Sequence, residues 1–192
     1  MNRDIQPSQT EIEYRQVISF CKALFDKKNK DYGTSWRILR LPSLTDQIFI
    51  KAQRIRSIQE KGLQKIQDGI EGEFIGIINY CIIALIQKSL ENSQQQEFSA
   101  EEIGTFYDQQ VDATLELLLN KNHDYGEAWR DMRIESMTDL ILMKIFRTKQ
   151  IEDNLGVTLV SEGVEANYQD MLNYAVFCLI KGKNEQMQSA QQ

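Results

Sequence analysis

The chain has 192 residues and a formal net charge of −6, with 42% hydrophobic and 26% charged residues. These values are typical of a soluble globular protein that is long enough to bury a core. The negative charge argues against a sequence-independent grip on a nucleic-acid polymer, but it is compatible with a small anionic ligand held by a local basic cluster. The sequence has two prolines and is rich in Leu, Ile, Gln, Glu and Lys, which favours helices.

Cysteine usage and hydropathy predict the compartment of the protein. Cys21, Cys81 and Cys178 lie in apolar, helix-like runs without CxxC spacing. We therefore expect buried free thiols in a reducing compartment rather than zinc ligands or disulfides. The most apolar run, residues 74–86, is too short to span a bilayer, and no apolar segment follows Met1. These features predict a cytoplasmic protein without a membrane partner.

A helix is predicted at the start of the chain. Ser8 to Glu11 has the spacing of a capping box, and apolar residues then recur at three- and four-residue steps to about Lys28. A ten-residue segment, 28–37, follows this helix. Gly33 within it is a natural left-handed helix stop.

Two further helices complete the first half of the chain. One is predicted to begin at residues 42–46, where a proline precedes a Ser-x-x-Asp cap. The other is predicted from about Gly69 to Lys88 and is apolar nearly all round from Phe74, so it should lie at the centre of a bundle. A polar linker at residues 93–97 precedes a new capping sequence.

The second half of the chain repeats the first. Adding 93 to a residue number in the segment 28–58 gives its counterpart, and 15 of 31 aligned pairs are identical. A one-residue insertion moves the offset to 94 in the third helix, where Asn79 matches Asn173. We therefore predict an all-α fold, an internally duplicated helical bundle with about three main helices per repeat. The predicted parts are a first repeat at 1–92, a second at 99–183 and a frayed tail at 184–192, with both repeats packed as one pseudo-symmetric domain.

Polar residues kept in both repeats are the candidates for binding chemistry, because repeats that shared only packing would share apolar positions. Lys51 and Arg54 are three residues apart on one helix face, and two such cations can hold a phosphate. The counterpart of the segment 28–37 is 121–130, and its aromatic residues can stack on a base. The candidate substrate-binding residues are Lys28, Asn29, Asp31, Tyr32, Trp36, Arg37, Lys51, Arg54 and Asn79 in the first repeat, and Lys121, Asn122, Asp124, Tyr125, Trp129, Arg130, Lys144, Arg147 and Asn173 in the second.

Carboxylates on the third helix of each repeat are candidates for metal binding. Glu162, Glu165 and Asp170 fall within one broad helix face. Hard oxygen ligands so arranged suit Mg²⁺, which prefers a few carboxylates together with phosphate and water. We predict Glu165 and Asp170 as catalytic residues. The predicted metal ligands are Glu162, Glu165, Asp170, Asp139, Glu71 and Asp46.

Structural roles could also explain some of these residues. Asp46 and Asp139 each lie three residues after a serine and can simply cap a helix. Asn29 and Asp31, beside Gly33, can serve only to end one. The acidic starts of the third helices interact favourably with the helix macrodipole even without a metal.

The two repeats differ in the third helix. Gly76 stands where the second repeat has Asp170, and Glu73 stands where it has Asn167. The second repeat therefore has the fuller carboxylate set, unless Glu73 compensates in the first. Two half-sites that face and complete each other are another arrangement compatible with this difference.

The chain resembles the nucleotide modification associated domain family in three segments. They are Lys-Asn-x-Asp-Tyr-Gly-x-x-Trp at 28–36 and again at 121–129, Ser-Leu-Thr-Asp-Gln-Ile-Phe-Ile-Lys-Ala-Gln-Arg-Ile-Arg at 43–56, and Glu-Phe-Ile-Gly-Ile-Ile-Asn-Tyr-Cys-Ile-Ile-Ala-Leu-Ile at 73–86. The resemblance covers nearly the whole chain as two tandem copies. It implies a bacterial or phage protein associated with base modification.

A more distant similarity is to the MazG-type all-α nucleoside triphosphate pyrophosphohydrolases. Those enzymes bind Mg²⁺ through a Glu-x-x-Glu and a Glu-x-x-Asp motif on neighbouring helices. Glu162 and Glu165 have the first spacing, whereas the second motif is missing because Asp170 follows Glu165 by five residues.

The leading hypothesis from the sequence is a Mg²⁺-dependent hydrolase that cleaves a free nucleotide between its α and β phosphates. The carboxylates would hold the metal, Lys144 and Arg147 would clamp the phosphates, and Tyr125, Trp129 and Asn173 would hold the base. One alternative is a module that binds a nucleotide or a partner enzyme without turnover. Another is a structural helical repeat that pairs with a second copy or with another chain. The expected partner is a nucleotide, and a homo-oligomer is also compatible with the repeat.

Overall fold

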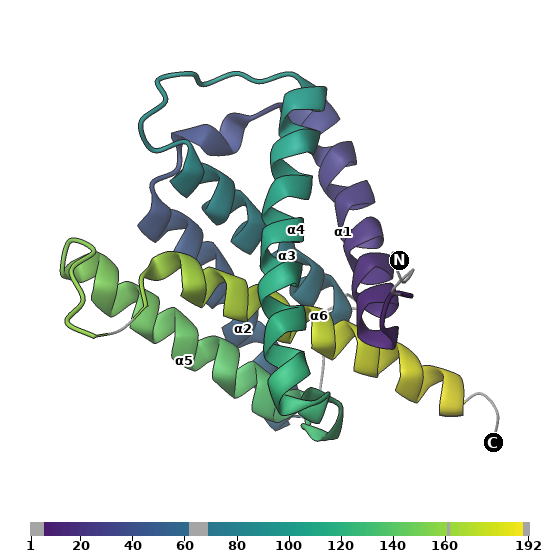
Figure 1. Cartoon of the computed structure of the whole chain (residues 1–192). Coiled ribbons are helices and arrows are strands. Elements are labelled where there is room, and N and C mark those ends of the chain that lie inside the picture. The colour runs from purple at the N-terminus through teal and green to yellow at the C-terminus, as the bar shows by residue number, and fades with distance from the viewer. Residues whose placement is uncertain (1–5, 62–68, 161, 190–192) are drawn as a thin grey trace, which may run out of the picture.

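The computed structural model describes residues 6–61, 69–160 and 162–189. For residues 123–125 and 185–189 it describes the backbone only. These residues form six α-helices and two short 3₁₀ helices, and no strand occurs among them (Figure 1). The predicted all-α fold with about three main helices per repeat is therefore confirmed.

The first repeat begins with α1, Gln9–Tyr32, which the Ser8 hydroxyl caps by accepting from the backbone N–H of Glu11. The helix ends at Gly33, whose φ of 57° lies in the left-handed region that favours glycine. A single 3₁₀ turn, η1, Ser35–Ile38, leads into α2, Leu41–Lys61. The repeat closes with α3, Ile70–Ser89.

The second repeat has the same order of elements. Ser99 and Glu102 form a capping box at the start of α4, Ala100–Tyr125, and Gly126 with a φ of 65° ends it. The 3₁₀ turn η2, Ala128–Asp131, then leads into α5, Ile134–Asp153. The last helix, α6, Val164–Ser189, continues through part of the segment for which a frayed tail is predicted, and residues 190–192 lie outside the described residues.

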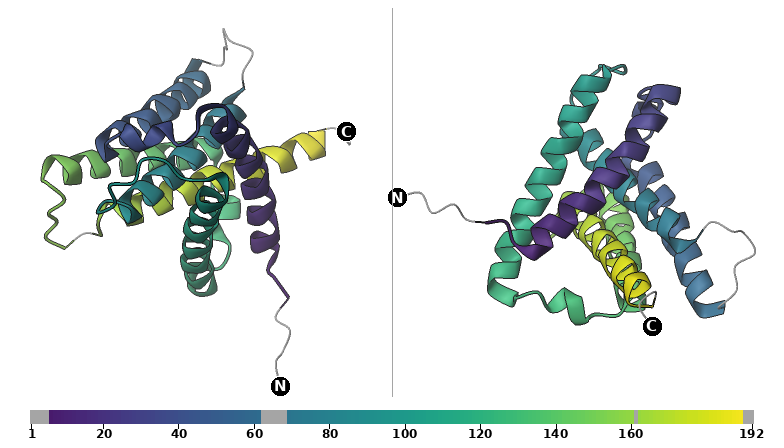
Figure 2. Two further views of the ribbon diagram at one scale, coloured as in Figure 1. Left: turned by 90° about the horizontal axis from the view of Figure 1, so that it is seen from above. Right: turned by 90° about the vertical axis from the view of Figure 1, so that its right-hand side faces the viewer.

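The four helices α2, α3, α5 and α6 pack on one another, with α3 against α6 at the centre. The helices α1 and α4 lie side by side across this layer, as the views in Figures 1 and 2 show. Each of the two contacts both α3 and α6, so each first helix covers part of the opposite repeat. One continuous hydrophobic core joins all six helices. The two repeats therefore form one body.

The helix α3 is the most apolar element. Its 20 residues are long and apolar enough to cross a membrane by length and composition alone. Most of its apolar side chains are buried in the bundle, where Ile77, Ile78, Ile82 and Ile86 are fully enclosed. A central core helix passes the same test of length and composition, so this is weak evidence for a membrane segment.

Two buried hydrogen bonds join the repeats reciprocally. The Tyr14 hydroxyl of α1 donates to Asn173 Oδ1 of α6 at 3.0 Å, and the Tyr107 hydroxyl of α4 donates to Asn79 Oδ1 of α3 at 2.9 Å. The two tyrosines are equivalent residues of the two repeats, and so are the two asparagines. Burial raises the pKa of both tyrosines, so their hydroxyls stay protonated and remain donors.

These bonds predict the effect of removing one hydroxyl. Tyr14→Phe leaves Asn173 Oδ1 buried without its partner, which should lower the free energy of unfolding by about 1–3 kcal/mol. Urea denaturation measures this loss, and Tyr107→Phe should give a similar one. Tyr32→Phe is the control, because Tyr32 is 71% exposed and its substitution should change stability by less than about 0.5 kcal/mol. A loss for Tyr14→Phe no larger than that of the control would contradict the role of the bond.

Candidate functional site

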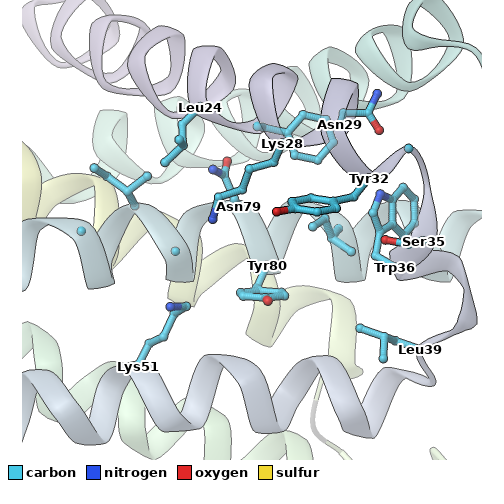
Figure 3. A pocket seen from close by; sticks show the side chains of 16 residues that line it. Leu24, Lys28, Asn29, Tyr32, Ser35, Trp36, Leu39, Lys51, Asn79 and Tyr80 are labelled. Atoms are coloured by element: carbon cyan, nitrogen blue, oxygen red, sulfur yellow. The ribbon is translucent and has the colours of Figure 1, made fainter.

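A cavity of about 430 Å³ lies inside the first repeat, between the end of α1, η1, α2 and α3. Its wall combines aliphatic side chains with four aromatic rings, two asparagines and two lysines, and no aspartate or glutamate is among its lining residues. Figure 3 labels most of the polar and aromatic side chains of the wall. The labelled ones are Lys28, Asn29, Tyr32, Ser35, Trp36, Lys51, Asn79 and Tyr80.

The last turns of α1 supply one side of the cavity. Tyr32 lies four residues after Lys28 and three after Asn29, so it is a neighbour of both on the helix surface. The left-handed conformation of Gly33 then turns the chain, and η1 brings Trp36 to the same cavity. The ten-residue segment predicted from the sequence is therefore a wall of this space.

Lys51 of α2 reaches the cavity from the opposite side. In Figure 3 it points up from α2, whereas Lys28 points down from α1. The missing side chain of Gly76 gives Lys51 its room, because a Cβ at position 76 would lie 2.5 Å from Lys51 Cε. Lys51 Nζ lies 3.3 Å from Glu73 Oε2, and Arg54 pairs with the same carboxylate.

Asn79 forms a wall of the cavity that the other repeat holds in place. Its Oδ1 accepts from the Tyr107 hydroxyl of α4, and its Nδ2 donates to the carbonyl oxygen of Cys21 at 3.1 Å. Both ends of the amide thus have partners within the protein. The side chain is therefore fixed before any ligand enters.

Two wall residues contain buried polar atoms without hydrogen-bond partners in the described part of the chain. They are Oδ1 of Asn29 and Nε1 of Trp36, and the equivalent Asn122 and Trp129 also contain one such atom each. An unpaired buried polar group costs about 1–3 kcal/mol. Since both repeats have these atoms, they do not by themselves distinguish the first repeat as a binding site.

Larger side chains stand at two of the corresponding positions in the described part of the second repeat. Phe177 stands where the first repeat has Ile83, and its ring stacks on Trp129 with centroids 4.2 Å apart. Asp170 stands where the first repeat has Gly76, and its Oδ2 accepts from Lys144 Nζ at 2.6 Å. Trp129 is consequently only 5% exposed. Trp36 thus borders a cavity, whereas the ring of Trp129 is packed against Phe177.

Several predicted binding residues instead hold the fold together. Arg37 is buried, donates to the carbonyl oxygens of Ser93 and Gln95 in the linker, and so fixes the 3₁₀ turn to that segment. Arg130 donates to Glu13 of α1 and lies over the ring of Trp129. These two arginines are kept in both repeats although neither lines the cavity.

The other predicted binding residues are spread over the molecule. Lys121 pairs with Asp170 at 3.4 Å, and Asn173 accepts from Tyr14. Asp31 and Arg147 are exposed, and Asn122 is partly buried. The side chains of Asp124 and Tyr125 lie outside the described part of the chain.

The predicted metal ligands do not converge. Asp46 pairs with Lys149 and Asp139 with Arg56 between α2 and α5, whereas Asp170 is engaged by Lys144. The remaining three, Glu71, Glu162 and Glu165, are exposed. Among the described residues, no group of three or more Asp, Glu, His or Cys side chains could hold a metal ion. The donor set therefore does not fit the Mg²⁺ site that the helical spacing suggests.

Sequence reasoning missed two contributors to the cavity. Tyr80 lies in an apolar run of the sequence that is typical of a core helix, yet it borders the cavity. Lys51 Nζ lies 5.9 Å from the centroid of its ring. Gly76 is conspicuous in the sequence as a lost carboxylate, whereas in the structure it creates space. The difference between Gly76 and Asp170 is visible in the sequence. That it opens space can be inferred only when the position of Lys51 is known.

Comparison with protein families gives a match in each repeat. The family model described as Nucleotide modification associated domain 1 matches residues 28–88 and again residues 121–181. Each match starts at the end of the first helix and continues to the end of the third or into it, so it contains most of the cavity wall in the first repeat. Searches of curated proteins and of solved structures found no match.

The filled and open repeats predict different costs for the same substitution. Trp129→Ala removes a ring that is stacked and buried, so it should lower the free energy of unfolding by about 3–5 kcal/mol. Trp36→Ala should cost less than about 2 kcal/mol, because Trp36 already borders an open space. Chemical denaturation of both variants measures the difference. Equal losses would mean that the two sites are packed alike.

Proposed function

The chain belongs to the Nucleotide modification associated domain 1 family, and from this premise we propose that its first repeat binds a free nucleotide in the cavity beside Trp36. The proposal is a binding function without turnover. The observation that carries it is the composition of the cavity wall, in which aromatic rings and two cations face one space and no carboxylate is among the lining residues.

The aromatic side chains of the wall suit a base. Tyr32, Trp36 and Tyr80 come from α1, η1 and α3, and Figure 3 shows them around the same space. Stacking of a base on an aromatic ring contributes about 1–3 kcal/mol and tolerates any of the bases. The wall thus offers recognition of a planar heterocycle.

The two lysines suit a phosphate. Lys28 and Lys51 approach the cavity from α1 and α2, on opposite sides of it. Lys28 has no hydrogen-bond or ion-pair partner within residues 6–61, 69–160 and 162–189. A lysine without a protein partner beside an apolar cavity is favourably placed to pair with an anionic ligand.

The positions of the carboxylates favour binding over hydrolysis. A metal-dependent hydrolase needs acidic ligands next to the phosphates. Glu73 pairs with Lys51, which lines the cavity, and with Arg54. Glu73 itself is not among the lining residues. The site therefore supports the non-catalytic alternative better than the hydrolase expected from helix spacing.

Tryptophan fluorescence tests the proposal directly. In Trp129→Phe, Trp36 is the single tryptophan, so a base stacking near it should quench the emission in a saturable manner. Lys28→Ala should weaken the apparent affinity about tenfold or more, because a charge-assisted hydrogen bond contributes about 1.5–3 kcal/mol.

The repeat supplies the controls for this experiment. Lys121→Ala changes the equivalent lysine of the filled repeat and should leave affinity within about twofold. The variant Trp36→Phe, which retains Trp129, should show no saturable quenching. Absence of quenching by any nucleotide in the single-tryptophan protein would refute the proposal, and release of pyrophosphate in the same mixture would favour the hydrolase.

Copying one residue from the second repeat should close the cavity. Gly76→Asp places a carboxylate opposite Lys51, as Asp170 lies opposite Lys144, and should lower nucleotide affinity at least about tenfold. The thermal midpoint should change little, because the atoms that a new Cβ meets belong to the flexible end of Lys51, which can move aside, and Asp is a slightly better helix former than glycine.

The control for this substitution is Gly104→Asp, which adds the same charge to α4, away from the cavity, where a new Cβ meets no atom closer than 4.0 Å. It should leave nucleotide affinity unchanged. Unchanged affinity in Gly76→Asp as well would place the ligand somewhere other than beside Lys51.

A further inference from the structure

The charge around the cavity determines what kind of phosphate it can balance. Lys28 and Lys51 are the charged side chains of the lining, and Lys51 shares the carboxylate of Glu73 with Arg54. A phosphate monoester carries about −1.5 to −2 at pH 7, because its second pKa is near 6. Two lysines beside the cavity therefore suit one terminal phosphate.

The geometry of the two lysines also favours a terminal phosphate. Lys28 and Lys51 reach the space from opposite helices, so each can contact a different oxygen of one group. A monoester offers three terminal oxygens, whereas a diester within a nucleic-acid strand offers two and carries a single negative charge. The arrangement thus selects a free nucleotide over a strand.

The lining of the cavity argues against a triphosphate. Lys28 and Lys51 are the charged residues of its lining, so additional phosphates would have no further lysine or arginine there. Protein sites for triphosphates with Mg²⁺ normally add one or two carboxylates, and the lining has none.

We infer that the cavity takes a nucleoside monophosphate, bound without a metal ion, with its phosphate between Lys28 and Lys51. This inference rests on the proposed nucleotide-binding function and narrows it to one phosphate. The protein would then bind a nucleotide that carries one phosphate. Such a nucleotide has not yet been converted to the triphosphate that polymerisation uses.

Calorimetry on the full chain with a ligand series tests the inference. The series comprises one nucleoside, its monophosphate, the methyl ester of that monophosphate, its diphosphate and its triphosphate, each with and without Mg²⁺, and is repeated for each common base. We expect the monophosphate to bind at least about tenfold more tightly than the nucleoside or the methyl ester, and more tightly than the triphosphate. Addition of Mg²⁺ should give no gain.

Two variants locate the preference within the cavity. Lys28→Ala should reduce the advantage of the monophosphate over its methyl ester to about twofold or less, whereas Lys121→Ala should preserve it. A tighter triphosphate, a requirement for Mg²⁺ or equal affinity along the series would overturn this inference and leave nucleotide binding intact. Failure of every member of the series to bind would overturn the proposed function itself.

Discussion

The reciprocal hydrogen bonds of Tyr14 with Asn173 and of Tyr107 with Asn79 are the constraint on which the structure depends. They fix each first helix against the third helix of the opposite repeat, at the centre of the shared core. Asn79 is also a wall of the ligand cavity. A residue of the second repeat, Tyr107, therefore fixes one wall of the cavity that the first repeat forms.

The two repeats differ in the side chains beside the motif tryptophan. The second repeat retains the lysine, asparagine and tryptophan of the motif, but Asp170 and Phe177 occupy the space next to them. In the first repeat, Gly76 and the smaller Ile83 leave that space open. Two substitutions on the third helix thus change the packing beside the motif tryptophan, while both repeats keep the same order of elements.

The helices, the duplication and the family were predictable from the sequence, because each rests on patterns that extend over many residues. The left-handed stops at Gly33 and Gly126 follow from local chemistry in the same way. The carboxylates were not placed correctly, since helical spacing shows that Glu162 and Glu165 share a face but not that the face is exposed to solvent. Retention in both repeats suggested that Arg37 binds a ligand. In the structure its guanidinium fixes a turn to the linker. The cavity depends on the missing side chain of Gly76 beside Lys51, which are 25 residues apart, and only the packing of α2 on α3 brings them together.

We propose as the central claim that the first repeat binds a ligand beside Trp36 and that the second repeat does not. The number of nucleotide molecules bound per chain at saturation tests this claim most directly, and equilibrium dialysis with a labelled nucleoside monophosphate measures it. The account predicts one molecule per chain. Two molecules per chain would show that the repeat containing Asp170 and Phe177 is also open, and would contradict the account.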